Sequence, residues 1–221
     1  MSWQIDWDKL QLGDILLTTG PSIISGLIRS GEAWADEMKH FDVADALEDS
    51  VESWFDPTWP SHSLFVYDIK EMKGAEMTYP KVQYCDLNDY SLKSNKSHIV
   101  GAFRCPYLDD KRNPDSGIYL KSRLKNWIDE YIKQNTTYGL TNLLSFITCL
   151  PQDTKHPVCS IWTNLGIVKS VFSEGYDLNF PKDWIIADSD NSPIIGLVSP
   201  SDQLKVFNEL GWGIQFKKFV K

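Results

Sequence analysis

The run from Ser61 to Tyr67 limits the possible folds more than any other segment of the chain. It is rich in aromatic and β-branched residues and lacks the regular polar alternation of a strand with one wet face. It follows Pro57 and Pro60, which mark a break in the preceding structure. The run therefore predicts a strand buried on both faces, inside a sheet that other elements must cover.

Neighbouring segments supply partners for that strand. Residues 70–74 predict a turn and Ala75 to Tyr79 a return strand, so that the two strands would form a hairpin. A short strand is expected at Ile15 to Leu17, after Gly13-Asp14, and another from His98 to Arg104. We also expect a closing strand from Ile214 to Val220. Taken together, these strands predict a small antiparallel sheet.

Helical periodicity marks most of the second half of the chain. Apolar residues recur at three- and four-residue steps from Gly117 to Gln134, and Ser199 with Asp202 forms a helix-start signal that Gly211 ends. Further helices are expected at residues 22–29 and 141–150 and after Cys159. Strands packed against separate helices predict an α+β fold.

Length and charge fit a single domain over residues 1–221 with one unusual segment. Hydrophobic residues make up 42% of the chain, and its net charge is −8. Residues 31–60 contain nine acidic residues and one basic residue, so the rest of the chain is formally neutral. Apolar residues recur within this segment at helical spacing. We interpret this segment as an acidic helical insertion. Its role could be that of a solvated surface, a lid over the site, a rim that steers cations or a contact for a basic partner.

Composition also excludes several classes of protein. The acidic balance and the lack of a basic stripe argue against nucleic-acid binding. The sequence has no secretory leader pattern and no apolar run that could span a bilayer, so we expect a cytoplasmic protein. Its four cysteines lack CxxC pairing and are expected to be free thiols. We expect no cofactor.

Cys159 is the candidate nucleophile. It lies at the predicted start of a helix, where the positive end of the helix dipole favours the thiolate, which is the form that attacks a carbonyl carbon. The backbone N–H groups of the first turn have no partners within the helix, so they could receive a developing oxyanion. Cys85, Cys105 and Cys149 are interpreted as ordinary buried thiols.

His62 is the candidate base, because it opens the buried strand and a cysteine nucleophile needs an imidazole within hydrogen-bond reach. Glu76, on the return strand, is the candidate for orienting that imidazole. Asp68, Asp86 or a backbone carbonyl could orient it instead.

His156 is the rival base, although its position in a proline-containing turn three residues before Cys159 makes it less suited to face the thiol. With Cys159 it could also be half of a metal site, but no second pair with ligand spacing exists, and we expect no metal. His40 and His98 are interpreted as structural or solvated.

Four motifs in this order carry a resemblance to a known family: Gly13-Asp14-Ile15-Leu16-Leu17, Ser61-His62-Ser63-Leu64, Ala75-Glu76 and Cys159-Ser160. The chain resembles the circularly permuted NlpC-type papain-like cysteine hydrolases, the YiiX/YebB-like group, in which the histidine precedes the cysteine. The resemblance covers most of the chain. It implies a permuted papain-like fold with Cys159, His62 and Glu76 as catalytic residues.

The resemblance also implies thiol-dependent cleavage of an amide, ester or thioester bond through an acyl-enzyme. Members or relatives of the family act on cell-wall peptides or on lipid or acyl substrates. A wall enzyme without a leader would need another route, such as phage lysis. The alternatives are an acyltransferase that uses the same acyl-enzyme and a non-catalytic module that binds a peptide, a lipid or a protein.

Overall fold

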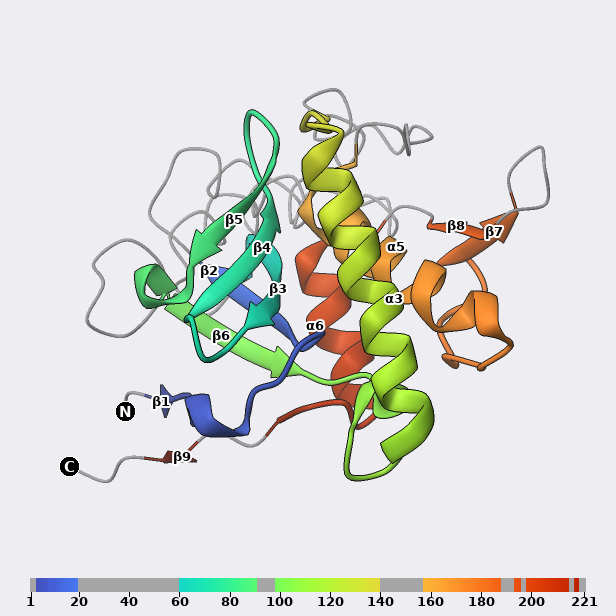
Figure 1. Ribbon diagram of the computed structural model, residues 1–221, viewed down its shortest axis with the longest axis horizontal. Helices are drawn as coiled ribbons and strands as arrows, with labels where there is room; N and C mark the ends of the chain where they lie inside the picture. Colours follow the sequence, from blue (N-terminus) through green and yellow to red (C-terminus); the bar gives the residue numbers. More distant parts are fainter. Residues whose placement is uncertain are drawn as a thin grey trace, which may run out of the picture.

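The computed structural model describes residues 3–19, 60–90, 98–139, 157–187, 193–195, 198–214 and 217–218. Its centre is a five-stranded antiparallel sheet in the order β5-β4-β3-β2-β6, with helices against it (Figure 1). The predicted α+β class with a small antiparallel sheet is confirmed. The strands are β2 (Ile15–Thr19), β3 (His62–Asp68), β4 (Lys73–Met77), β5 (Val82–Asp86) and β6 (His98–Phe103).

The strand β3 lies in the middle of the sheet and is buried on both faces, as its sequence predicts. All of its residues from Ser63 to Tyr67 are buried. Phe65 and Tyr67 belong to the larger hydrophobic core, and Leu64 and Val66 belong to a smaller core on the opposite face. Alternating side chains of one strand therefore contribute to two cores.

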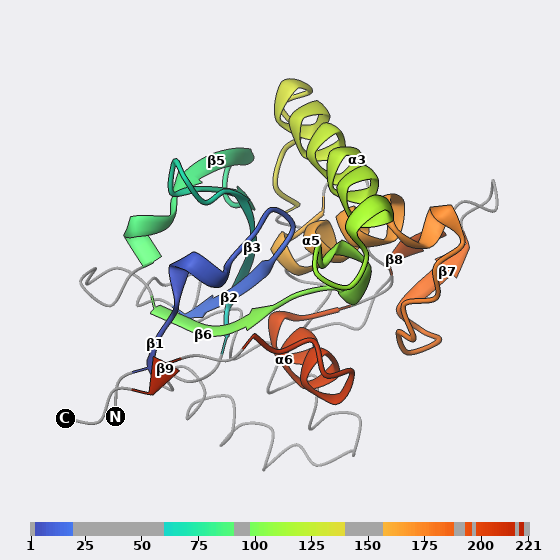
Figure 2. The same cartoon turned by 60° about the horizontal axis from the view of Figure 1, so that its bottom comes forward.

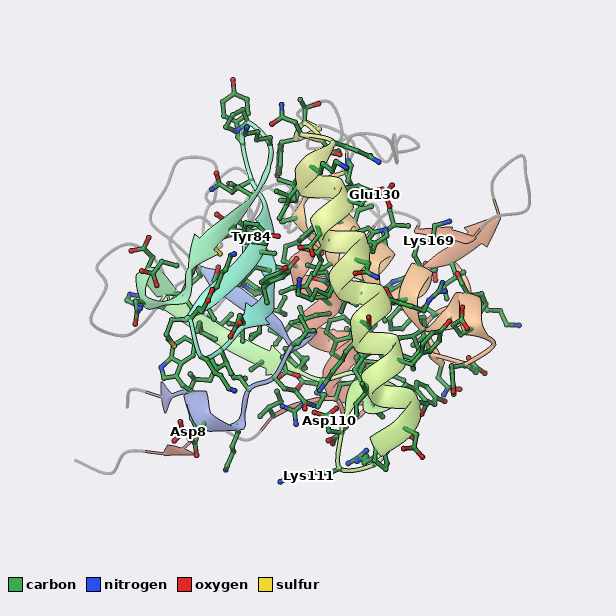
Figure 3. All side chains as sticks on the ribbon, in the orientation of Figure 1. Asp8, Tyr84, Asp110, Lys111, Glu130 and Lys169 are labelled. Carbon is green, nitrogen blue, oxygen red and sulfur yellow. The ribbon has the colours of Figure 1, made fainter. Side chains whose placement is uncertain are left out.

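Two helices cover the larger core: α3 (Pro114–Lys133) and α5 (Cys159–Ser170). They pack against each other, and α5 packs directly on β3 (Figure 2). The ring of Trp162 meets that of Phe65 edge-on at 5.4 Å between centroids. A Cβ at Gly166 would lie 2.9 Å from the Phe65 ring, so glycine allows α5 its close approach to the sheet. Figure 3 shows the side chains, Tyr84 among them, that fill the space between sheet and α3.

The helix α6 (Pro200–Glu209) packs against α5 and starts where the sequence predicts. Ser199 and Asp202 form a complete capping box. Gly211 follows the helix with φ +69°, a left-handed conformation that glycine adopts without strain. Ser199 and Gly211 thus limit the helix as predicted.

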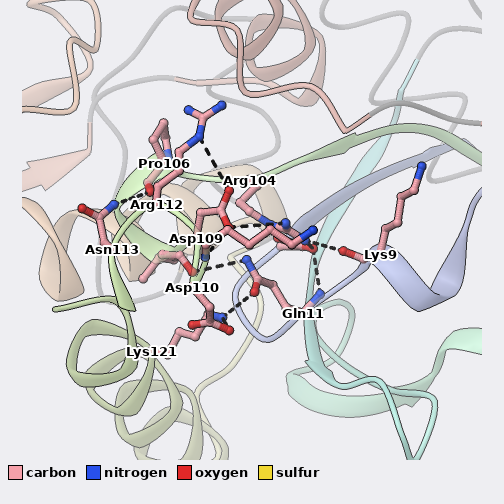
Figure 4. Close-up of polar contacts among 12 residues, drawn as sticks. Lys9, Gln11, Arg104, Pro106, Asp109, Asp110, Arg112, Asn113 and Lys121 are labelled. Atoms are coloured by element: carbon pink, nitrogen blue, oxygen red, sulfur yellow. Dashed lines mark hydrogen bonds and ion pairs between the residues drawn. The ribbon is translucent and has the colours of Figure 1, made fainter. Parts of the chain in front are cut away.

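A polar cluster fixes the start of β2, at the end of the strand away from His62 (Figure 4). Arg104 donates from Nε and Nη2 to the two carboxylate oxygens of the buried Asp14, each at 2.8 Å. Lys121 of α3 donates to Gln11 and to Asp110. Sheet, loop and helix are therefore joined by charge-assisted bonds at this end.

Short elements complete the fold. The strands β1 (Trp3–Gln4) and β9 (Lys217–Lys218) pair and bring the two ends of the described chain together. The strands β7 (Ile185–Ala187) and β8 (Pro193–Ile195) form a second small pair. The 3₁₀ helices are η1 (Trp7–Lys9), η2 (Leu87–Tyr90), η3 (Pro106–Leu108) and η4 (Phe172–Glu174).

Several predicted boundaries were wrong. Gly74 lies inside β4 and not in the turn, because it pairs with Val66 of β3 and with Cys85 of β5. A Cβ at this position would be 2.7 Å from the Cys85 sulfur, so the packing there requires glycine. The helix α3 begins at Pro114, three residues early, since proline suits the first turn. Ile214 lies outside the closing strand, of which Lys217–Lys218 is described.

The predicted helices at 22–29 and 141–150 lie outside the described residues, as does the acidic segment apart from Pro60. His40, Cys149 and His156 also lie there. Within the described part of the chain, no helix is both long enough and apolar enough to cross a membrane.

Candidate active site

Cys159 is the first residue of α5, as the sequence predicts. The preceding Val158 is extended and caps the helix without a side-chain bond. Every residue of α5 except Lys169 is buried, and Cys159 itself is 2% exposed. Its thiol therefore lies in a helix start that is enclosed by protein.

His62 is the first residue of β3, opposite Thr18 of β2, and it is partly buried. Its ring forms a hydrogen bond with the Cys159 thiol and an ion pair with Glu76. Nε2 lies 2.9 Å from the Oε2 atom of Glu76, so Nδ1 is the ring nitrogen left for the sulfur. The structure thus brings Cys159, His62 and Glu76 together, with His62 between the other two.

Strand register explains why Glu76 reaches His62. Glu76 lies opposite Leu64 in the antiparallel pair, and residues opposite each other share a face of the sheet. His62 is two residues before Leu64 and so lies on that same face, diagonal to Glu76. A separation of fourteen residues becomes a direct contact because the hairpin aligns the two strands.

The other candidates for orienting His62 bind elsewhere. Asp68 accepts hydrogen bonds from the backbone N–H groups of Lys70 and Glu71, in the turn after β3. Asp86 accepts from the backbone and side chain of Asn88. These two carboxylates stabilise turns.

Two residues that the sequence did not indicate complete the surroundings of Glu76. The Tyr90 hydroxyl donates to Oε2 at 2.5 Å, and the Gln83 amide donates to Oε1 at 2.9 Å. Gln83 lies directly opposite Glu76 in the pair of β4 and β5. The strand β5 was not predicted, because its only fully buried residue is Val82 and its apolar pattern is weak. Once β5 is known, the register identifies Gln83.

Charge is separated across the Cys159–His62 pair. Burial alone would raise the pKa of the Cys159 thiol, but an adjacent imidazolium that hydrogen-bonds the sulfur lowers it. Burial would lower the pKa of His62, but the Cys159 thiolate and Glu76 raise it. Each charged form stabilises the other. The shifts in these two pKa values favour the thiolate–imidazolium form of the pair.

Glu76 is held ionised although it is buried. Burial would raise the pKa of its carboxyl group, but the hydrogen bond and charge of His62 and the bonds from Tyr90 and Gln83 lower the pKa to about 2. An ionised carboxylate only accepts hydrogen bonds. The Nε2 atom of His62 must then carry a proton.

The backbone N–H groups of Ser63 in β3 and Ser160 in α5 also lower the pKa of the Cys159 thiol, by a smaller amount than His62 does. Ser160 is fixed in turn, because its hydroxyl donates to the Val198 carbonyl at 2.6 Å. Nucleophile, helix start and strand are thus joined by short polar contacts.

A buried polar network behind α5 fixes this helix start. Gln203 of α6 donates from Nε2 to the Ser160 carbonyl, to Thr163 and to Asn164, at 2.9 to 3.1 Å. The Thr163 hydroxyl also meets that of Ser63, 3.0 Å away. All five side chains are fully buried. The sequence alone does not indicate this network, because its members come from β3, α5 and α6 and only the packing of these elements brings them together.

The remaining candidate groups lie apart from this site or outside the described chain. His98 is exposed at the start of β6. Cys85, Cys105 and Cys159 are free thiols. Among the described residues no group of three or more His, Cys, Asp and Glu side chains could hold a metal ion.

Comparisons with protein-family models, with curated proteins and with solved structures gave no match. The function of this chain is therefore inferred from the geometry and electrostatics of its own residues.

Proposed function

We propose that the chain is a cysteine hydrolase of the permuted papain-like kind, with Cys159 as nucleophile, His62 as base and acid, and Glu76 as the orienting carboxylate. The observation that carries the proposal is that His62 interacts with the Cys159 thiol and is also bonded to Glu76, with its Nε2 atom 2.9 Å from Oε2. This chemistry requires a base within hydrogen-bond reach of the nucleophile and an orienting group within hydrogen-bond reach of the base.

The first half-reaction forms an acyl-enzyme. The Cys159 thiolate attacks the carbonyl carbon of an amide, ester or thioester, forming a C–S bond and a tetrahedral oxyanion. N–H groups at the start of α5 without intrahelical partners would stabilise this oxyanion. The bond to the leaving group then breaks as the His62 imidazolium donates its Nδ1 proton to that group.

The second half-reaction restores the enzyme. Neutral His62 takes a proton from water, whose oxygen attacks the thioester carbon. The C–S bond breaks, the acid product leaves and the Cys159 thiolate again faces the imidazolium. Glu76 keeps the ring in the tautomer that serves both steps, since its carboxylate binds the Nε2 proton throughout.

The test is trapping of an acyl-enzyme. The protein is mixed with p-nitrophenyl acyl esters, acyl thioesters and peptide anilides, and the first-turnover burst and the mass of the Cys159 peptide are measured. Wild type and Cys105→Ala should give a burst and an acyl adduct on Cys159, and Cys159→Ala and His62→Ala neither. A burst that survives in Cys159→Ala would disprove the assignment.

A further inference from the structure

Glu76 is bound from two sides. On the side of β3 it meets His62, and on the side of β5 it meets Gln83 and Tyr90, because β4 lies between these strands. The Oε2 atom accepts from His62 and from Tyr90, and Oε1 accepts from Gln83. A carboxylate with donors on both oxygens cannot turn about its terminal bond without losing one of them.

The two donors on the β5 side come from one continuous segment. Gln83 is part of β5, and Tyr90 ends η2, which follows β5 directly. Leu87 anchors η2 in the smaller core, and its N–H donates to the Met72 carbonyl at 2.8 Å. Tyr90 thus reaches Glu76 from a turn that the core holds in place.

We propose that Tyr90, assisted by Gln83, is a positioning residue that holds the Glu76 carboxylate against the Nε2 atom of His62. This inference rests on the proposed function, because it assigns a second layer of support to the same site. Tyr90 and Gln83 bind Glu76, and neither is among the groups that shift the pKa of Cys159. Their effect on the thiol is transmitted through Glu76 and the imidazole.

The chemistry of the donors favours this role. A tyrosine O–H and an amide N–H both donate, and they bind an ionised carboxylate more strongly than a neutral one, so they favour Glu76 ionised and in place. An ionised, fixed Glu76 keeps the proton of neutral His62 on Nε2 and leaves Nδ1 bare toward the thiol. Without the two donors, Glu76 can turn toward β5 and solvent, and His62 loses its fixed tautomer.

The matched control is Tyr84 of β5. Its hydroxyl donates to a carboxylate, Asp129 of α3, at 2.5 Å, the distance found between Tyr90 and Glu76. Tyr84 lies opposite Ala75, however, and so on the sheet face away from Glu76. Tyr84→Phe therefore removes an equivalent bond without touching the line of contacts to Cys159.

The experiment compares full-length wild type, Tyr90→Phe, Gln83→Leu, the double variant and Tyr84→Phe. Ring-nitrogen NMR shifts of His62, assigned with His62→Gln, report its tautomer and titration, and thiolate absorbance reports Cys159. In the double variant we expect the His62 midpoint to fall by about one pH unit, with both neutral tautomers populated above it. Tyr90→Phe should show part of this change, and Tyr84→Phe none.

The proposal is overturned if Tyr90→Phe and the double variant match Tyr84→Phe in both spectra. Gln83→Leu, at an exposed position, keeps the test decisive if Tyr90→Phe does not fold. These readouts need no substrate. If wild-type Cys159 itself titrates as an ordinary thiol, the proposed function fails; if only the variants lack effect, the positioning role fails.

Discussion

Cys105 and Cys159 are two buried thiols at helical starts, and their pKa values are shifted in opposite directions. Cys105 precedes η3 and binds the backbone N–H groups of Tyr107 and Leu108; Cys159 begins α5 and binds those of Ser63 and Ser160. Burial raises the pKa of the Cys105 thiol to about 12. The pKa of Cys159 is lowered.

The difference between the two thiols is His62. Two amide donors at a helical start do not offset the loss of solvation at Cys105, whereas an imidazolium does so at Cys159. Position at a helix start, which made Cys159 a candidate in the sequence, is therefore the weaker of its two advantages. The stronger one comes from a strand nearly a hundred residues earlier.

The largest expected effect comes from removing that imidazolium. His62→Ala should make Cys159 resemble Cys105, because burial would then act without an opposing charge. The thiolate fraction at neutral pH should fall at least about a hundredfold, as measured by thiolate absorbance against pH. His98→Ala, at an exposed histidine, is the control. An unchanged thiolate titration in His62→Ala would remove the electrostatic basis of the site.

Replacing the orienting carboxylate should have the next largest effect. Glu76 has a folded-state pKa lowered to about 2, so its contribution to stability is present above its ordinary pKa and is lost as pH falls toward 2. Glu76→Gln should lower the free energy of unfolding by about 2 kcal/mol at neutral pH. The difference from wild type should vanish near the acidic limit.

Chemical denaturation at a series of pH values measures this dependence. Glu71→Gln, at an exposed turn residue, should show no such loss. A Glu76→Gln penalty that stays constant down to the acidic limit would indicate a packing effect and not a charge effect.

The network behind α5 should have a smaller effect. Gln203→Leu removes the donor to the Ser160 carbonyl and leaves buried acceptors unpaired, which should cost about 1 to 2 kcal/mol in denaturant unfolding. Gln134→Leu, at an exposed helix end, should cost almost nothing. Equal losses in the two variants would show that the network does not stabilise the helix start.

The smallest expected effect is the loss of folding stability when each of the two cysteines is replaced by alanine. Cys105→Ala leaves a small cavity in the larger core and should cost about 1 kcal/mol in thermal or denaturant unfolding. Cys159→Ala should cost more, since it leaves the buried His62 ring without the thiolate that faces it. An equal or smaller loss at Cys159 would show that the ion pair does not stabilise the fold.

Much of the sheet could be predicted, because its strands carry strong local signals. Ser63 to Tyr67 are apolar or small throughout, and a strand buried on both faces has that composition. The edge strand β5 was missed, since an exposed edge places few demands on its side chains. The sequence predicts a turn at Gly74, because the packing of Cys85 and Leu87 around this glycine depends on the fold and is not visible in the linear sequence.

The residues of the candidate site also fall into those that the sequence indicates and those that it does not. Cys159 and His62 each begin an element, and the sequence indicated both beginnings. Glu76 was expected from its place on the return strand, and the register explains its contact. Tyr90, Gln83 and Gln203 carried no local signal, because their importance comes only from the partners that the fold brings to them.

Local signals in the sequence predict most of the central strands, the helix start at Cys159 and the hairpin that carries His62 and Glu76, since propensity, capping and hydrophobic period act over a few residues. Which thiol is acidic depends on the three-dimensional fold. Solvation and Coulomb interactions depend on distance in space, and the largest cause that lowers the pKa of Cys159 is the imidazole of His62, which another element places against it and which Cys105 lacks.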